Sequence, residues 1–132
     1  MIVADASAVI QASLSEADLE SLGRYDLVAP PLLWSEATSA IHELRWRRQI
    51  SADLASVALA RFSQFPIRSR RPAALYREAW RIADRLGWAK TYDAEYVALA
   101  RLARCRLVTV DARLAASASS LVQVVSPGDL GG

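Results

Sequence analysis

The chain has 132 residues, is 53% hydrophobic and carries a formal net charge of only +2. This length fits one domain over residues 1–132, because domains commonly hold about 100–150 residues around a core of their own. A single cysteine and a single histidine exclude an intrachain disulfide and a Cys/His zinc cluster. The sequence has no recognisable signal peptide and no apolar run of about 18 residues, so we expect a cytoplasmic protein without membrane association.

Short apolar runs alternate with longer amphipathic segments along the chain. The first run, Ile2-Val3-Ala4, is apolar at every position, which is typical of a strand covered on both faces in a parallel sheet. Ser51 has the position of a helix N-cap, and Gly87 that of a helix end. We expect strands at residues 2–4, 27–29, 107–110 and 121–125, a short extended segment at 67, helices at 6–13, 15–22, 32–48, 51–65, 75–86, 92–104 and 113–119, a loop at 68–72 and an irregular tail at 126–132.

This order of elements predicts the fold class. Strands that alternate with helices are typical of an α/β fold with a parallel sheet and right-handed crossovers. We expect a central parallel sheet of about four to five strands, flanked by helices. The central helices are expected to form a helical arm on this sheet and not a second domain.

Two of the predicted strands end in an aspartate. Ile2-Val3-Ala4 is followed by Asp5, and the run at 107–110 is followed by Asp111. In an open parallel sheet, the residues just past the carboxyl ends of the strands line the ligand crevice. The two strands would therefore each place a carboxylate at one rim of the sheet, although each aspartate also suits a cap on the helix that follows it.

Two further acids interrupt the apolar stripes of helices. Glu36 lies between Leu33 and Ala40 on one stripe, and Asp93 opens a stripe that continues at Tyr96. A carboxylate turned toward the interior costs several kcal/mol unless it is paired or bound to a cation. Two simpler interpretations stay open, namely Glu36 at an edge position that reaches solvent and Asp93 as a helix N-cap.

The four acids are more informative as a set than singly. Two follow predicted strands and two lie on predicted inward faces of helices. No basic residue recurs near all four acids in the sequence as a partner for them. Carboxylates held close together repel one another, which raises their pKa values, and a divalent cation relieves the repulsion. Because a ligand set made only of oxygen suits Mg²⁺ or Mn²⁺, the pattern predicts a metal site formed by Asp5, Glu36, Asp93 and Asp111.

The sequence around the four acids reads IVADASA at residues 2–8, LWSE at 33–36, TYDAEYVALA at 91–100 and LVTVD at 107–111. These motifs resemble those of the PIN-domain ribonucleases, most closely the VapC toxins of bacterial and archaeal toxin–antitoxin pairs. The resemblance covers nearly the whole chain, with all four acidic motifs in the family's order.

The resemblance implies a PIN-like fold and an Mg²⁺- or Mn²⁺-dependent endoribonuclease, the toxin of a type II toxin–antitoxin system. Asp5 and Asp93 would be the main metal ligands, Asp111 would complete the site, and Glu36 would bind a metal directly or through water. In such a site, metal-activated water hydrolyses the RNA phosphodiester without a nucleophilic side chain or a histidine.

The resemblance also implies supporting residues and partners. Ser7, two residues after Asp5, and Thr109 would orient carboxylates or waters from behind the ligands. Family members of this kind are commonly homodimers, and each is bound by a VapB-type antitoxin that can place a basic side chain near the acids. The expected partners are therefore RNA, an antitoxin and a second copy of the chain.

Several basic residues are candidates for contacts with RNA phosphates around the acidic site. For any single arginine, ordinary solvated charge or ion pairing is the simpler explanation. Lys90 is the only lysine and stands three residues before Asp93. The residues selected for RNA binding are Arg45, Arg48, Arg70, Arg71 and Lys90.

Two other functions are compatible with parts of the pattern. An aspartate-based phosphoryl-transfer protein also places an aspartate after an early strand, but it uses a lysine after a late strand, whereas Lys90 precedes a helix. The Asp-x-Asp arrangement of such phosphatases is also missing after Asp5. A catalytically silent PIN-like interaction module is the second alternative, and the four intact acids argue against it. Cleavage of RNA with Mg²⁺, with EDTA and after Asp5→Asn would separate these functions.

Overall fold

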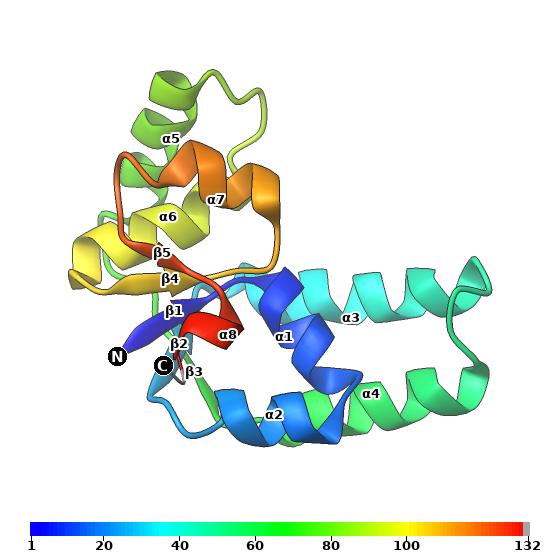
Figure 1. Cartoon of the computed structure of the whole chain (residues 1–132). Coiled ribbons are helices and arrows are strands. Elements are labelled where there is room, and N and C mark those ends of the chain that lie inside the picture. Colours follow the sequence, from blue (N-terminus) through cyan, green and yellow to red (C-terminus); the bar gives the residue numbers. More distant parts are fainter. Residues whose placement is uncertain (131–132) are drawn as a thin grey trace.

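The computed structural model describes residues 1–130 and contains a five-stranded sheet in the order β3-β2-β1-β4-β5 (Figure 1). The strands are β1 (Ile2–Ala4), β2 (Leu27–Ala29), β3 (Ile67–Ser69), β4 (Arg106–Val108) and β5 (Val124–Val125). Neighbouring strands are all parallel, and each connection between them contains a helix. The predicted α/β class, with its parallel sheet of four to five strands, is confirmed.

Helices pack on the sheet and extend beyond it. They are α1 (Ala6–Ser13), α2 (Glu16–Leu22), α3 (Leu32–Trp46), α4 (Ala52–Gln64), α5 (Leu75–Leu86), α6 (Tyr92–Ala103), α7 (Ala112–Ala118) and α8 (Pro127–Leu130). Figure 1 shows α5, α6 and α7 gathered on one side of the sheet and α1 to α4 on the other. There, α3 and α4 lie side by side as the predicted helical arm. Within residues 1–130, no helix is long and apolar enough to cross a membrane.

β1 is the central strand, because it pairs with both β2 and β4. All three of its residues are buried, as expected for an apolar run between two layers of helices. Ala4 stands opposite Val108, so the chain leaves β1 and β4 at the same edge of the sheet. This pairing carries Asp5 and Asp111 to one edge.

β4 is shorter than the strand predicted at residues 107–110, because it ends at Val108. The side chain of Thr109 explains the difference. Its hydroxyl accepts a hydrogen bond from the N–H of Asp111 at 3.0 Å, and this local bond turns the chain toward α7.

Two boundaries in the middle of the chain also differ from the prediction. Arg68 and Ser69 were expected in a loop but belong to β3, because they pair with residues 28 and 29 of β2. α3 ends at Trp46, two residues before its predicted end, and Arg48 has left the helix with a φ of 58°.

The C-terminal segment is shorter in strand and richer in helix than predicted. The strand expected at 121–125 covers only Val124–Val125 (β5), and the tail expected to be irregular contains the short helix α8. The hydroxyl of Tyr25 donates a hydrogen bond to the carbonyl of Leu130 at 2.5 Å and so holds α8 against the body of the protein. The last two residues of the predicted tail, Gly131 and Gly132, lie outside the described residues.

α6 is buried along most of its length. Residues 94–100 are all inaccessible to solvent or nearly so, and a helix that is apolar almost all round needs neighbours on every side. α5, β1 and β4 supply those neighbours. The core therefore fixes the position of Asp93, which lies in the first turn of α6.

Candidate active site

Asp5 is buried, with 4% of its surface exposed. It caps α1, and its Oδ1 accepts hydrogen bonds from the N–H of Ala8 at 3.0 Å and from the hydroxyl of Ser7 at 2.7 Å. Its Oδ2 accepts a hydrogen bond from the hydroxyl of Thr109 at 2.6 Å. Burial raises the pKa of Asp5 above its ordinary value of 3.8, and it outweighs the three hydrogen bonds, which lower the pKa.

Ser7 and Thr109 connect the ends of β1 and β4. Their hydroxyl oxygens lie 3.1 Å apart, and the Ser7 hydroxyl also accepts a hydrogen bond from the N–H of Val110 at 3.1 Å. Both hydroxyls donate a hydrogen bond to Asp5. Together they fix the direction of both oxygens of the Asp5 carboxylate.

Asp111 lies at the same edge of the sheet and is exposed. It caps α7, because its Oδ1 accepts hydrogen bonds from the N–H groups of Arg113 at 2.9 Å and Leu114 at 3.2 Å. Asp5 and Asp111 are thus both helix caps and residues of the sheet edge, so the two interpretations of the sequence hold together. Capping engages Oδ1 of Asp111, which leaves metal binding through Oδ2 compatible with the cap.

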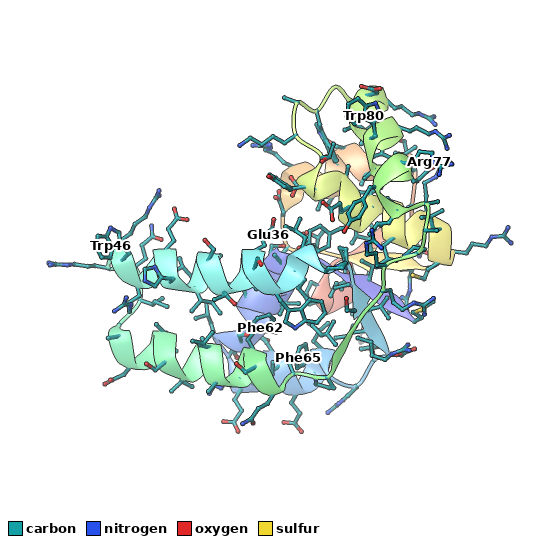
Figure 2. The ribbon with its side chains drawn as sticks, turned by 180° about the vertical axis from the view of Figure 1, so that it is seen from behind. Glu36, Trp46, Phe62, Phe65, Arg77 and Trp80 are labelled. Atoms are coloured by element: carbon teal, nitrogen blue, oxygen red, sulfur yellow. The ribbon has the colours of Figure 1, made fainter. Side chains whose placement is uncertain are left out.

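Glu36 comes from α3 and does not simply extend into solvent. It is half-buried, and its Oε1 accepts a hydrogen bond from the hydroxyl of Tyr96 at 3.0 Å. Figure 2 shows Glu36 on the side of α3 that faces α6. Burial raises the pKa of Glu36 above its ordinary value of 4.5, and the charges of Asp93 and Asp5 raise it further.

Asp93 comes from the first turn of α6 and is not its N-cap. Thr91 occupies the N-cap position, without a hydrogen bond from its side chain. Although Asp93 is exposed, the protein atoms around its carboxylate desolvate it and raise its pKa above the ordinary value of 3.8; the charge of Asp111 raises this pKa further, and Arg113 lowers it. The capping interpretation of Asp93 is therefore wrong, because the N-cap lies two residues earlier, at Thr91, and α6 begins at Tyr92.

A cavity of about 320 Å³ lies among the acids and is lined by Glu36, Asp93 and Asp111. Asp5 is buried and does not line the cavity, but it lies near enough to Asp111 for that charge to raise the pKa of Asp5. The charge of Asp5 in turn raises the pKa of Glu36. The structure thus brings the four acids, which are spread over the sequence, within electrostatic reach of one another at the carboxyl edge of the sheet.

The donor set of this cavity fits a hydrated divalent cation. All four acids offer oxygen, and none of them takes part in the ion pairs formed within residues 1–130. The acids surround the cavity loosely, since no three Asp, Glu, His or Cys side chains of these residues are grouped closely enough to hold a metal ion directly. Mg²⁺ typically keeps several waters and binds only one or two carboxylates, which agrees with this spacing.

Of the five basic residues predicted to contact RNA, Lys90 lines the cavity. Arg45 and Arg48 lie at the far end of the arm, where Nη2 of Arg45 stands 3.2 Å from Nε2 of His42. A helix rises 1.5 Å per residue, so Arg45 lies roughly 13 Å along α3 from Glu36. These two arginines do not flank the acids, and contact with RNA at the arm stays a prediction.

Arg70 and Arg71 also lie away from the cavity. They follow β3, which is an outer strand of the sheet. Arg70 extends toward the sulfur of Met1, at 3.8 Å, and the guanidinium of Arg71 lies 5.1 Å from the ring centre of Tyr76. Their contact with RNA likewise stays a prediction. The sequence did not show that β2 separates β3 from β1.

Sequence reasoning missed a second basic residue of the cavity, Arg113. It lines the cavity together with Lys90, Trp88 and Tyr92. A signal for it does exist in the sequence. Arg113 falls in the first turn of a helix, where the helix dipole disfavours a cation, and it stands only two residues after Asp111.

Two residues of α6 were also missed, because they stand in a run typical of a hydrophobic core. Tyr96 is fully buried, yet its hydroxyl contacts Glu36. Glu95 is a fifth acid, with 8% of its surface exposed, and burial and then the charge of Glu36 raise its pKa. Of the two, only Glu95 could have been singled out from the sequence, because its charge interrupts the otherwise apolar run at residues 94–100.

Comparison with known proteins agrees with this fold. The family model described as PIN domain matches residues 2–119. The chain is 35% identical over 115 residues to VapC ribonuclease Mb0985 of Mycobacterium bovis and to ribonuclease VapC9 of Mycobacterium tuberculosis. These alignments cover 86% of this chain and 88% of each relative.

Two solved structures have a similar fold. The crystal structure of PAE2754 from Pyrobaculum aerophilum matches with a TM-score of 0.72 and 26% identity, over 98% of this chain and 92% of that one. FitAcB from Neisseria gonorrhoeae matches with a TM-score of 0.58 and 20% identity, over 97% and 99% of the two chains, which is a likeness of fold alone. The chain therefore belongs to the PIN-domain family. Within it, the curated relatives are VapC ribonucleases, as the motifs predicted.

Proposed function

We propose that the chain is an Mg²⁺- or Mn²⁺-dependent endoribonuclease and the toxin of a type II toxin–antitoxin system. The observation that carries the proposal is a cavity lined by Glu36, Asp93 and Asp111, with Asp5 within electrostatic reach of Asp111 and Glu36 and with no ion pair to any of the four acids within residues 1–130. Relatives at 35% identity are named ribonucleases, and the resemblance to VapC toxins supplies the toxin–antitoxin context. A single domain over residues 1–132 and a cytoplasmic location belong to the same proposal.

The four acids would hold a divalent cation, which when bound lowers the pKa of a coordinated water and offsets the charge that develops on the phosphate. Asp5 is held ready for this role, because Ser7 and Thr109 fix its two oxygens. The pKa values of Asp5, Glu36 and Asp93 are raised by burial and by neighbouring carboxylates, so binding a cation relieves an electrostatic cost.

Lys90 and Arg113 would hold the RNA backbone in the same cavity. Both line it together with three of the acids, and neither forms an ion pair within the described part of the chain. A cation of the protein can bind a phosphate oxygen beside the carboxylates and so fix the position of the scissile bond. Trp88 and Tyr92 in the lining offer aromatic faces for a base.

A VapB-type antitoxin and a second copy of the chain are the proposed protein partners. An apolar groove between α1 and α3 begins beside Ser7 and is lined by Ile10, Leu14 and Leu44. An antitoxin segment that lies in this groove would end beside Asp5, where a basic side chain would neutralise the acids. The homodimer rests on the family resemblance.

The test is cleavage of an end-labelled RNA in Mg²⁺ or Mn²⁺, in EDTA and by the variant Asp93→Asn. Asp93 is exposed and does not cap α6, so asparagine is compatible with the fold. We expect EDTA and the variant each to slow cleavage by about a thousandfold or more. Asp53→Asn is the matched control and should retain activity, because Asp53 is an exposed acid in the first turn of α4.

Two results would contradict the proposal. Cleavage that continues both in EDTA and in Asp93→Asn would show that the acidic cavity is not the active site. A wild-type chain that binds RNA or an antitoxin but cleaves nothing in either metal would instead identify the silent interaction module.

A further inference from the structure

A hydrogen bond joins α3, in the helical arm, to the buried helix α6, which packs on the sheet. The hydroxyl of Tyr96, on α6, donates to Oε1 of Glu36, on α3, at 3.0 Å. Tyr96 has no exposed surface, and it stands three residues after Asp93 on the same helix. One turn of α6 therefore carries one acid of the cavity and the group that contacts another.

We infer that Tyr96 is a positioning residue for metal binding, whose hydroxyl holds Oε1 of Glu36 so that Oε2 is presented to a divalent cation in the cavity. This inference rests on the proposed function. It concerns a residue that would touch neither RNA nor metal and would act through Glu36.

Glu36 needs such support more than the other acids do. Its side chain has one more rotatable bond than aspartate, and it enters the cavity from the arm, whereas Asp5 and Asp111 are fixed at the sheet edge by hydrogen bonds from backbone N–H groups. A hydrogen bond to Oε1 selects one orientation of the carboxylate and leaves Oε2 without a protein donor within residues 1–130. Ligand carboxylates are typically held in this way by a partner behind the metal site.

The properties of Tyr96 suit a permanent donor. The Tyr96 hydroxyl donates to Oε1 of Glu36 at 3.0 Å, and it is the only protein donor to this carboxylate within residues 1–130. The Tyr96 side chain has no exposed surface, so the position of this donor is fixed by the core. Tyr96 therefore provides a fixed point to which the arm's acid is tied.

The experiment is a double-mutant cycle on the full chain with Tyr96→Phe, Glu36→Gln and the double variant. Calorimetry measures Mn²⁺ affinity, and cleavage of a labelled RNA gives kcat and KM. Tyr96→Phe is expected to weaken Mn²⁺ binding and to lower kcat by about tenfold each, with KM for RNA unchanged because Tyr96 is buried. In the Glu36→Gln background, Tyr96→Phe should have no further effect.

Tyr25→Phe is the matched control, because it removes a hydroxyl whose hydrogen bond goes to Leu130. It should leave Mn²⁺ affinity and kcat unchanged. A Tyr96→Phe variant that binds Mn²⁺ as the wild type does would overturn the inference. Equal losses from Tyr96→Phe with and without Glu36→Gln would also overturn it, because the effect would then come from packing alone.

A second variant keeps the test decisive if Tyr96→Phe does not fold. Glu36→Asp retains the carboxylate but draws it back by one methylene from the Tyr96 hydroxyl, so we expect a similar loss of Mn²⁺ affinity, and wild-type affinity would overturn the inference. A wild-type chain that neither binds Mn²⁺ nor cleaves RNA would refute the proposed function itself. Metal-dependent cleavage by the wild type and equally by Tyr96→Phe would refute the role of Tyr96 alone.

Discussion

The carboxyl edge of the sheet and the helical arm both contribute acids to one cavity, but they hold them differently. At the sheet edge, Asp5 accepts hydrogen bonds from a backbone N–H and from the hydroxyls of Ser7 and Thr109. On the arm, the carboxylate of Glu36 relies on the hydroxyl of Tyr96, which belongs to another helix. The sheet edge is therefore the rigid half of the site, and the arm is the half whose acid is held by a single tertiary contact.

Thr109→Val is expected to damage the rigid half most. Valine has the shape of threonine but removes the donor to Oδ2 of Asp5 and the acceptor for the N–H of Asp111. Because buried groups lose their partners, the free energy of unfolding should fall by about 1–3 kcal/mol, and kcat should fall roughly 10–100-fold. Urea unfolding and RNA cleavage measure both effects. Thr109→Ser, which keeps the hydroxyl, should be much milder, and a wild-type kcat for Thr109→Val would contradict the comparison.

Asp5→Ala and Glu36→Gln should move the stability of the metal-free protein in opposite directions. Asp5→Ala removes the cap of α1 and the acceptor for two hydroxyls, which should cost about 1–2 kcal/mol. Glu36→Gln removes a charge that burial and neighbouring acids disfavour, yet it keeps an acceptor for Tyr96, so its melting temperature should rise. Thermal unfolding in EDTA checks both. A fall in melting temperature for both variants would show that the arm's acid is as structural as Asp5.

The smallest expected effect is a dependence of stability on pH. The pKa values of Asp5, Glu36 and Asp93 are raised in the folded state. At a pH between the ordinary and the raised values, the folded protein therefore binds more protons than the unfolded chain does. The contribution of these acids to stability is then lost as the pH rises from the ordinary values near 4 through the raised ones. In EDTA, the free energy of unfolding attributable to them should decline over this range, and Mg²⁺ should reduce the decline. The difference between wild type and Glu36→Gln in the slope of unfolding free energy against pH gives the contribution of Glu36. Identical slopes would exclude such a contribution.

The positions of the acids at the sheet edge were easier to predict from the sequence than the contacts of the acid on the arm. Asp5 and Asp111 follow apolar runs, and the rule that parallel strands end at one edge places them together without further information. The end of β4 at Val108 was missed because it depends on a hydrogen bond from Asp111 to the side chain of Thr109, which strand periodicity does not report. The α/β fold itself followed from the alternation of elements.

Contacts between helices were much harder to predict. The hydroxyl of Tyr96 was hidden by the apolar stripe of α6, because its partner Glu36 lies 60 residues away in the chain. Arg45 and Arg48 were expected beside the acids, but the length of α3 carries them to the far end of the arm. Periodicity identifies which face of a helix is buried, whereas the direction in which the helix extends is set by tertiary packing.

The place of β1 in the sheet has a consequence for how the protein is made. Asp5 directly follows β1, but β1 is paired with β4, which is synthesised only after residue 105. Parallel strands so distant in sequence pair late, because loop closure must precede the contact. A chain translated only as far as residue 105 would hold Asp5 without Asp111, so the activity proposed here would arise only after β4 has been synthesised.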